Sequence, residues 1–133
     1  MERFTKTRVR YADTDQMGCV HHAKYFEYFE IGRTEYMRQA GCSYADMEKM
    51  GYFLMLVDVH ATYRKAVGYD TEITIKTRVG ELVKTQVTFL YCVEDEEGSV
   101  LCEGWTKLAC TNEDGKLRRI PEEIREVLKG DEQ

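Results

Sequence analysis

The densest group of reactive side chains lies in residues 10–25, which read R-Y-A-D-T-D-Q-M-G-C-V-H-H-A-K-Y. Two carboxylates, Asp13 and Asp15, are followed by Gly18 and by two adjacent histidines, His21 and His22. A carboxylate can act as a nucleophile or as a general base. The first N–H groups of a helix lack partners inside it and can hold a developing oxyanion. The spacing therefore predicts acyl-transfer chemistry, provided that a helix begins close to the histidines.

Other interpretations of this segment compete with that one. Asp-x-Asp-x-x-Gly is common in turns, and it also resembles the start of a calcium-binding loop. The twelfth position from Asp13 is Lys24 rather than a glutamate, which excludes an EF-hand. Adjacent side chains on a helix diverge by roughly 100°, so His21 and His22 are not expected to share a metal ion, and no zinc spacing connects them to His60. We expect neither a metal nor a cofactor.

A long helix is expected over about residues 22–40, because apolar side chains recur there at steps of three and four residues. Glu27, Glu30, Arg33 and Arg38 are predicted to lie largely outside this stripe, and Gly41 ends the helix. The stripe itself consists of Tyr25, Phe26, Phe29, Gly32, Tyr36, Met37 and Ala40.

The rest of the chain is predicted to consist mostly of strands. A short helix over about 43–50 follows the long one, and Pro121 opens a terminal helix. A long helix packed against an antiparallel sheet is the most economical arrangement of these elements, which defines an α+β fold. Alternating or mostly apolar residues place the strands at about 4–11, 53–63, 71–79, 87–93 and 100–111.

Composition excludes several classes of protein. No internal repeat or linker interrupts the chain, so residues 1–133 are predicted to form a single domain. A net charge of −5 argues against a nucleic-acid partner, and the chain lacks the stretch of about 18 apolar residues that a membrane span requires. Five cysteines, an odd number, indicate reduced thiols and a cytoplasmic location. The exposed edges of the sheet favour self-association.

Residues 13–25, followed by F-E-x-x-R-T-E at 29–35, closely resemble the opening of the 4-hydroxybenzoyl-CoA thioesterase family. The resemblance is strongest to its Tol–Pal-associated acyl-CoA thioesterases, and residues 63–70 resemble a later loop of the family. It implies a hotdog fold, in which a five- or six-stranded antiparallel sheet wraps a long central helix. It also implies hydrolysis of acyl-CoA, and a homodimer or homotetramer with active sites between subunits.

The same resemblance assigns roles to individual residues. Asp15 matches the family's catalytic carboxylate, acting as nucleophile or general base. His22 matches a second catalytic position, where the backbone N–H polarises the thioester carbonyl and the side chain assists. The substrate-binding residues that we predict are Tyr25, Gly18, Lys84 and Arg64, of which Lys84 and Arg64 are candidate ligands of the CoA phosphates.

Alternatives remain at this point. A hotdog dehydratase would act on the same thioesters, but the position of Asp15 ahead of the helix favours hydrolysis. A non-catalytic acyl-thioester sensor would not need that carboxylate, and a scaffolding oligomer would use the motif only as a turn. The family usually has a proline where residues 64–67 read R-K-A-V, and many relatives have an aromatic residue in place of His21. These departures bear on which acyl group is bound rather than on the type of reaction.

Overall fold

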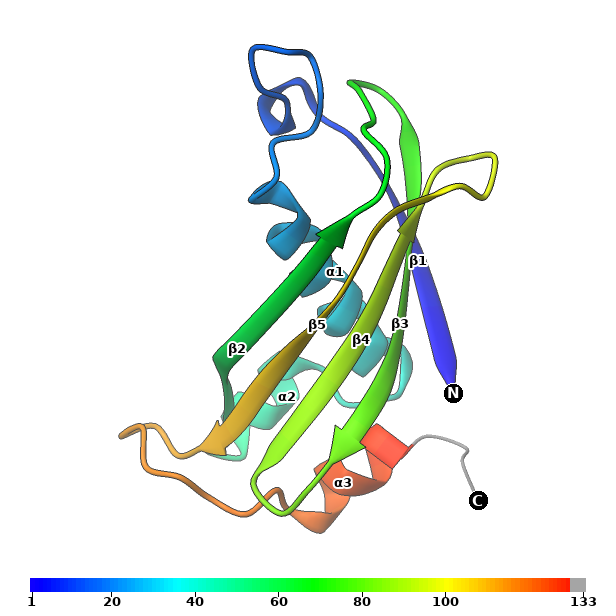
Figure 1. Cartoon of the computed structure of the whole chain (residues 1–133). Coiled ribbons are helices and arrows are strands. Elements are labelled where there is room, and N and C mark those ends of the chain that lie inside the picture. The colour runs from blue at the N-terminus through cyan, green and yellow to red at the C-terminus, as the bar shows by residue number, and fades with distance from the viewer. Residues whose placement is uncertain (130–133) are drawn as a thin grey trace.

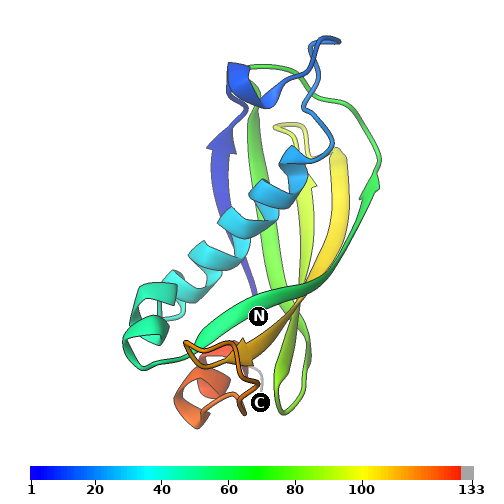
Figure 2. The same ribbon diagram turned by 90° about the vertical axis from the view of Figure 1, so that its left-hand side faces the viewer.

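The computed structural model describes residues 1–129 and shows a five-stranded antiparallel sheet with a long helix lying across one face (Figures 1 and 2). The strands follow the order β1-β3-β4-β5-β2. This arrangement confirms the predicted α+β hotdog fold. The elements are β1 (Glu2–Arg8), a 3-10 turn η1 (Tyr11–Asp13), α1 (Lys24–Gln39), α2 (Tyr44–Lys49), β2 (Phe53–Tyr63), β3 (Glu72–Leu82), β4 (Gln86–Glu94), β5 (Val100–Thr111) and α3 (Glu122–Lys129).

The core lies between α1 and the sheet, and side-chain alternation along the strands creates it. In β4, Val87, Phe89, Tyr91 and Val93 are buried, while the residues between them are partly exposed. The ring of Phe29 on α1 stacks on that of Tyr91, with centroids 4.4 Å apart. The apolar stripe of the helix and the alternating strands therefore meet as predicted.

Two glycines allow the helix to approach the sheet closely. A Cβ atom on Gly32 of α1 would lie 2.5 Å from Thr77 Oγ1 and 2.8 Å from Ile75 Cγ2. A Cβ atom on Gly104 of β5 would lie 2.7 Å from the Phe29 ring. A larger side chain at Gly32 would push α1 away from the sheet, and one at Gly104 would collide with both the Phe29 ring and the His60 carbonyl oxygen of β2.

Two predictions about these elements are wrong. The first strand ends at Arg8 rather than near residue 11, because residues 11–13 form a 3-10 turn. Arg33, predicted outside the apolar stripe, is only 8% exposed. It lies on the same helix face as Phe29 and Tyr36, four residues before it and three after it, and the core accommodates its guanidinium beside the phenol of Tyr91.

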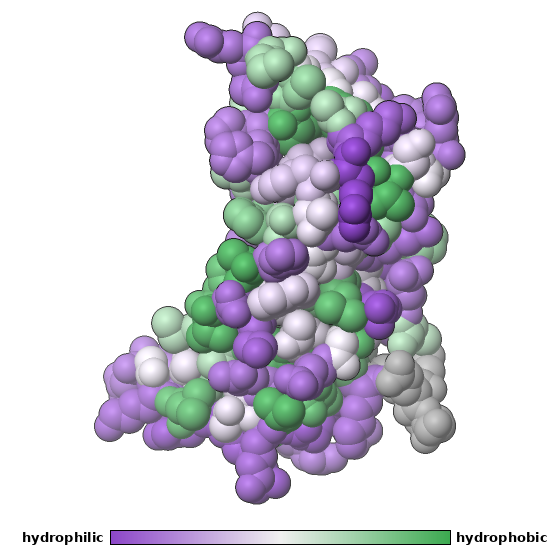
Figure 3. Space-filling view, in the orientation of Figure 1, coloured by the Kyte–Doolittle hydropathy of each residue, from purple (hydrophilic) through white to green (hydrophobic). Residues whose placement is uncertain are grey.

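Strand β2 forms one edge of the sheet and exposes apolar side chains. Met55, Leu56 and Val57 are about half exposed, at 50%, 51% and 53%. The pairing with β5 shifts between Leu56 and Asp58, which leaves Val57 as a bulge. Hydrophobic surface is visible along this margin in Figure 3. An apolar edge strand of this kind is a site where a further strand can pair.

Candidate active site

The loop before α1 is held in a compact turn around Asp15. The Asp15 N–H donates to the Cys19 carbonyl oxygen at 2.9 Å, and the Gly18 N–H donates to the Asp15 carbonyl oxygen at 3.0 Å. Gly18 has a φ of +81°, a left-handed conformation that glycine adopts without steric cost. Gly18 therefore closes the turn, as the sequence predicts. Residues 15–19 form a compact hydrogen-bonded turn that precedes α1.

The turn orients the carboxylate of Asp15 but engages only one of its two oxygen atoms. Its Oδ1 atom accepts the Met17 N–H at 2.9 Å and the Cys19 N–H at 3.4 Å. Its Oδ2 atom accepts no hydrogen bond from residues 1–129, and the residue is exposed. One oxygen thus fixes the side chain, while the other is available to a substrate or a water molecule.

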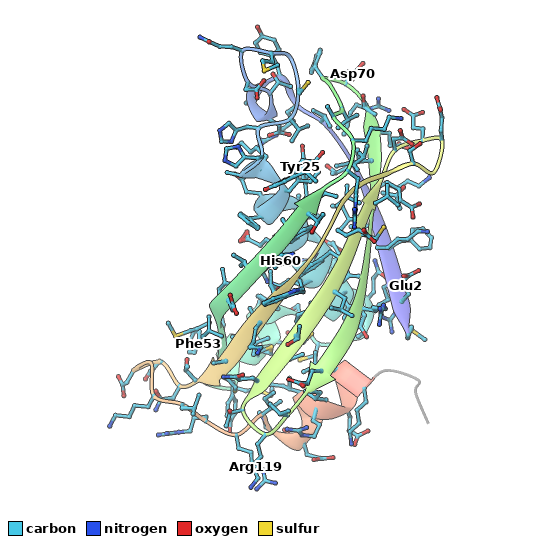
Figure 4. All side chains as sticks on the ribbon, in the orientation of Figure 1. Glu2, Tyr25, Phe53, His60, Asp70 and Arg119 are labelled. Carbon is cyan, nitrogen blue, oxygen red and sulfur yellow. The ribbon has the colours of Figure 1, made fainter. Side chains whose placement is uncertain are left out.

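An open cavity of about 380 Å³ brings most of the predicted site together. Asp15, His22, Tyr25 and Arg64 all contribute to its wall. Tyr25 is labelled at the upper end of the molecule in Figure 4, near the end of β2. Burial, followed by the effects of Cys102 and Tyr63, raises the pKa of Tyr25 to about 12, so its phenol is neutral at physiological pH. The full lining is Asp15, Val20, His22, Tyr25, Tyr63, Arg64, Lys65 and Ala66.

The backbone at the start of α1 leaves one N–H group without an acceptor. The His21 N–H donates to the Asp13 carbonyl oxygen at 2.9 Å, and the Lys24 N–H donates to the His21 carbonyl oxygen at 2.9 Å. The Ala23 N–H donates to His21 Nδ1 at 3.2 Å. Within residues 1–129, the His22 N–H donates to no protein atom. It is therefore a free donor at the positive end of the helix dipole, as an oxyanion site requires.

The two adjacent histidines lie closer together than a regular helix would allow. Their rings stack with centroids 4.3 Å apart and an interplanar angle of 29°. The divergence expected for neighbouring helical residues does not apply, because both precede α1, which begins at Lys24. No group of three or more potential metal ligands gathers in the described part of the chain.

Asp13, the other acid of the motif, is buried and fully engaged. Its Oδ2 atom accepts the Arg10 N–H at 3.0 Å and the Tyr28 hydroxyl at 3.0 Å, while Oδ1 accepts Arg10 Nη2 at 3.0 Å. Burial acts to raise the pKa of Asp13, but the hydrogen bonds from Arg10 and Tyr28 outweigh it and hold the pKa below its usual value of 3.8. Asp13 thus anchors the loop to α1.

Two of the predicted binding residues lie outside the cavity that contains Asp15. Gly18 shapes the neighbouring turn. Lys84 lines a different cavity of about 660 Å³, together with Arg119 and Arg125. Arg125 Nη2 donates to the carbonyl oxygens of Val83 and Lys84 at 2.9 and 3.2 Å. Figure 4 places Arg119 at the lower end of the molecule and Tyr25 near the upper end, so the length of the sheet separates the two cavities.

Sequence reasoning missed Tyr63 as a member of the site. Tyr63 ends β2, and its hydroxyl donates to the His22 carbonyl oxygen at 2.9 Å. The only signal in the sequence was that residues 63–70 resemble a family loop. The contact joins positions 41 residues apart, so no local pattern could reveal it.

Comparisons with known proteins establish the family. A model of the Thioesterase-like superfamily matches residues 9–128. A putative esterase of Aquifex aeolicus is 37% identical over 124 residues, which are 93% of this chain and 95% of that protein. The putative acyl-CoA thioesterase YneP of Bacillus subtilis is 31% identical over 106 residues, 80% of this chain and 77% of that protein.

Solved structures agree with this result. The structure described as a DHNA-CoA thioesterase from Staphylococcus aureus superposes with a TM-score of 0.88 at 31% identity, covering 95% of this chain and 87% of that one. The chain therefore belongs to the Thioesterase-like superfamily. The predicted class, a hydrolase of thioester bonds, is confirmed.

None of the helices in residues 1–129 is long and apolar enough to cross a membrane. The thiols of all five cysteines are free, and Cys102 and Cys110 are buried.

Proposed function

We propose that the protein is an acyl-CoA thioesterase, which hydrolyses an acyl-CoA to a carboxylic acid and free CoA. The observation that carries this proposal is the cavity that Asp15 shares with His22 and Tyr25. The resemblance of residues 13–25 to the 4-hydroxybenzoyl-CoA thioesterase motif, and the similarity to YneP, support the substrate class. The assignment to the Tol–Pal-associated branch remains a prediction from that motif.

In the proposed reaction, the thioester oxygen accepts a hydrogen bond from the His22 N–H. As a general base, Asp15 takes a proton from a water molecule whose oxygen attacks the carbonyl carbon; the C–S bond then breaks and CoA leaves as a thiolate. As a nucleophile, Asp15 forms a mixed anhydride that water hydrolyses. A thiolate leaves with little protonation, so one carboxylate and one oxyanion donor are sufficient for either route.

The proposed active form is a dimer that pairs β2 with β2 of a second copy. Such antiparallel pairing joins two five-stranded sheets and covers Met55, Leu56 and Val57, which are half exposed in the single chain. A two-fold axis across β2 reverses the second copy. Its Lys84 end then lies beside the Asp15 end of the first copy, although the two are far apart within one chain.

In the proposed dimer, Lys84 would be placed to contact the CoA phosphates, the role predicted for it. Lys84, Arg119 and Arg125 line one cavity, whose only acidic lining residue is Glu122. The pyrophosphate and 3′-phosphate of CoA carry several negative charges, which lysine and arginine recognise by charge-assisted hydrogen bonds. We therefore assign this cationic cavity to the nucleotide end of CoA and the Asp15 cavity to the thioester.

A thiol-release assay over a panel of acyl-CoAs tests the proposal, with wild type, Asp15→Asn and the control Asp114→Asn compared. Asp114 lies in an exposed turn at the other end of the chain. We expect turnover in wild type and the control, and loss of turnover with retained CoA binding in Asp15→Asn. CoA binding without turnover in wild type would indicate a sensor instead, and unchanged turnover in Asp15→Asn would refute the assigned carboxylate.

The cationic cavity has its own test. Lys84→Ala should raise the KM for an acyl-CoA by about tenfold, since a charge-assisted hydrogen bond contributes about 1.5 kcal/mol. The KM for the matching acyl-N-acetylcysteamine thioester, which lacks the phosphates, should stay the same. Lys116→Ala, a change in an exposed turn, is the control. An equal rise in KM for both substrates would contradict the assignment.

A further inference from the structure

The hydroxyl of Tyr63 links the last residue of β2 to the main chain just before α1. It donates to the His22 carbonyl oxygen at 2.9 Å. Burial, and then the nearby Cys102, raises the pKa of Tyr63 above its usual value of 10. The hydroxyl is therefore a permanent donor over the pH range in which an enzyme would be assayed.

The ring of Tyr63 contacts the same part of the site. It meets the His22 imidazole edge-on, with centroids 6.4 Å apart, and the Tyr25 ring at 5.6 Å. Tyr63 also lines the cavity that contains Asp15. One side chain thus touches both the backbone and the side chain of His22, and forms part of the wall beside the candidate carboxylate.

The peptide group that follows His22 has few other restraints. His22 lies outside α1, ahead of the N-cap residue Ala23. The residue before it is held on both sides, because the His21 N–H donates to the Asp13 carbonyl oxygen and the His21 carbonyl oxygen accepts the Lys24 N–H. Among residues 1–129, the other donor to the His22 carbonyl oxygen besides Tyr63 is the Tyr25 N–H, at the longer distance of 3.3 Å.

The His22 N–H belongs to the peptide group that carries the His21 carbonyl oxygen, which the Lys24 N–H holds. The Tyr63 hydroxyl holds the next peptide group, on the other side of the His22 Cα, so the two bonds together fix the main chain around this N–H. Without the bond from Tyr63 the main chain at His22 is held firmly from one side only, and an oxyanion donor is effective only when it points at the developing charge. A displacement of about 1 Å at such a site can cost about 100-fold in rate.

We propose that Tyr63 is a positioning residue for thioester hydrolysis: its hydroxyl fixes the main chain at His22 so that the His22 N–H faces the oxyanion. The proposal rests on the function proposed above. Because the oxyanion forms only in the transition state, loss of the hydroxyl should lower kcat more than it raises KM.

The variant Tyr63→Phe tests this directly, since it keeps the ring contacts and removes only the hydrogen bond. We expect kcat to fall by about 10- to 100-fold, with KM for the acyl-CoA within about twofold of wild type. The control is Tyr69→Phe, which removes an exposed hydroxyl whose ring packs on Tyr11 near the same loop. That control should retain the kcat of wild type.

Binding of two inhibitors separates positioning from a general loss of structure. A CoA trifluoromethyl ketone, whose hydrate mimics the tetrahedral intermediate, should bind Tyr63→Phe more weakly by the factor lost in kcat. A CoA S-alkyl thioether, which has no carbonyl oxygen, should bind as it does to wild type. Equal weakening of both inhibitors would overturn the proposal, because it would show a damaged pocket rather than a misdirected donor.

The outcomes also separate this proposal from the proposed function. If wild type releases no thiol from any acyl-CoA, the proposed function fails and the role of Tyr63 fails with it. If wild type is active and Tyr63→Phe matches it in kcat and in affinity for the fluoroketone, only the role of Tyr63 is overturned. As a check independent of activity, the His22 amide resonance should shift in Tyr63→Phe while the His21 amide, held by Asp13, stays in place.

Discussion

Asp13 and Asp15 are separated by one residue, yet the fold gives them opposite environments. Asp13 is 2% exposed, and both of its carboxylate oxygens accept hydrogen bonds, from Arg10 and Tyr28. Asp15 is exposed, and only one of its oxygens is engaged, by two N–H groups of its own turn. Hydrogen bonds within the protein therefore occupy the carboxylate of Asp13, whereas one oxygen of Asp15 remains available to a ligand.

The two acids of this short motif therefore have different roles, one in structure and one in the proposed chemistry. The saturated carboxylate of Asp13 secures the loop to α1, and its main chain accepts the N–H of His21. The loop so fixed places Asp15 in the wall of the same cavity as His22. Substitutions at the two acids should therefore separate stability from catalysis.

The largest expected effect is on turnover. Asp15→Asn should lower kcat by about 10²- to 10⁴-fold, the usual contribution of a positioned general base. Its free energy of unfolding should stay within about 0.5 kcal/mol of wild type, as for other exposed positions. Thiol release and urea titration of the same preparation measure both quantities. A large loss of stability would mean that Asp15 is structural and would remove the contrast with Asp13.

A smaller effect, on the free energy of unfolding, is expected when Asp13 is substituted. Asp13→Asn should destabilise the fold by about 1–3 kcal/mol, because it leaves the buried hydroxyl of Tyr28 and the donors of Arg10 poorly paired. Urea unfolding at neutral pH measures this loss. Full stability in the variant would show that the network around Asp13 does not hold the loop.

The difference in stability between wild type and Asp13→Asn should depend on pH. Because the pKa of Asp13 is lowered in the folded state, its carboxylate stabilises the fold above the unfolded-state pKa of about 3.9, and this contribution is lost as the pH falls through the folded-state value. The stability gap between wild type and Asp13→Asn should therefore be full at pH 6 and shrink below about pH 4. Unfolding midpoints across this range measure it, and a gap that did not change would contradict the ionised network.

The smallest effect belongs to Tyr28. Tyr28→Phe removes one of the hydrogen bonds to Asp13 and should cost about 0.5–1.5 kcal/mol. The hydroxyl is a donor throughout the accessible pH range, since burial and the Asp13 carboxylate raise its pKa. A cost larger than that of Asp13→Asn would place the anchor in the tyrosine rather than in the acid.

Most of the fold could be predicted because its helices and strands show local patterns of apolar residues. Alternation identified β4 and β5, and the three- and four-residue steps identified α1. The environment of Arg33 could not be predicted from charge alone, since its burial depends on Tyr91, which approaches from the sheet. The end of β1 was misplaced because the pattern continued into a 3-10 turn.

The candidate site was predictable only in part, for a similar reason. The motif placed Asp15, His22 and Tyr25 near one another because they are close in the chain, and their shared cavity agrees with that expectation. The pairing of Tyr63 with His22 and the separation of Lys84 from Asp15 depend on how β2 and the β3–β4 turn are arranged in space. Tertiary arrangement of this kind leaves no periodic trace in the sequence.

The close approach at Gly32 and Gly104 has a consequence for chain-length selection. With α1 pressed against the sheet and the Phe29 ring filling the gap beside Gly104, a fatty tail cannot pass between the helix and the sheet at this point. In the proposed dimer, the surface that selects acyl chains by length would then lie on the outside of the helix and along the margin of the sheet, where the second copy would supply the opposite wall. Selectivity for short or long substrates would accordingly evolve through surface residues, leaving the packed interior unchanged.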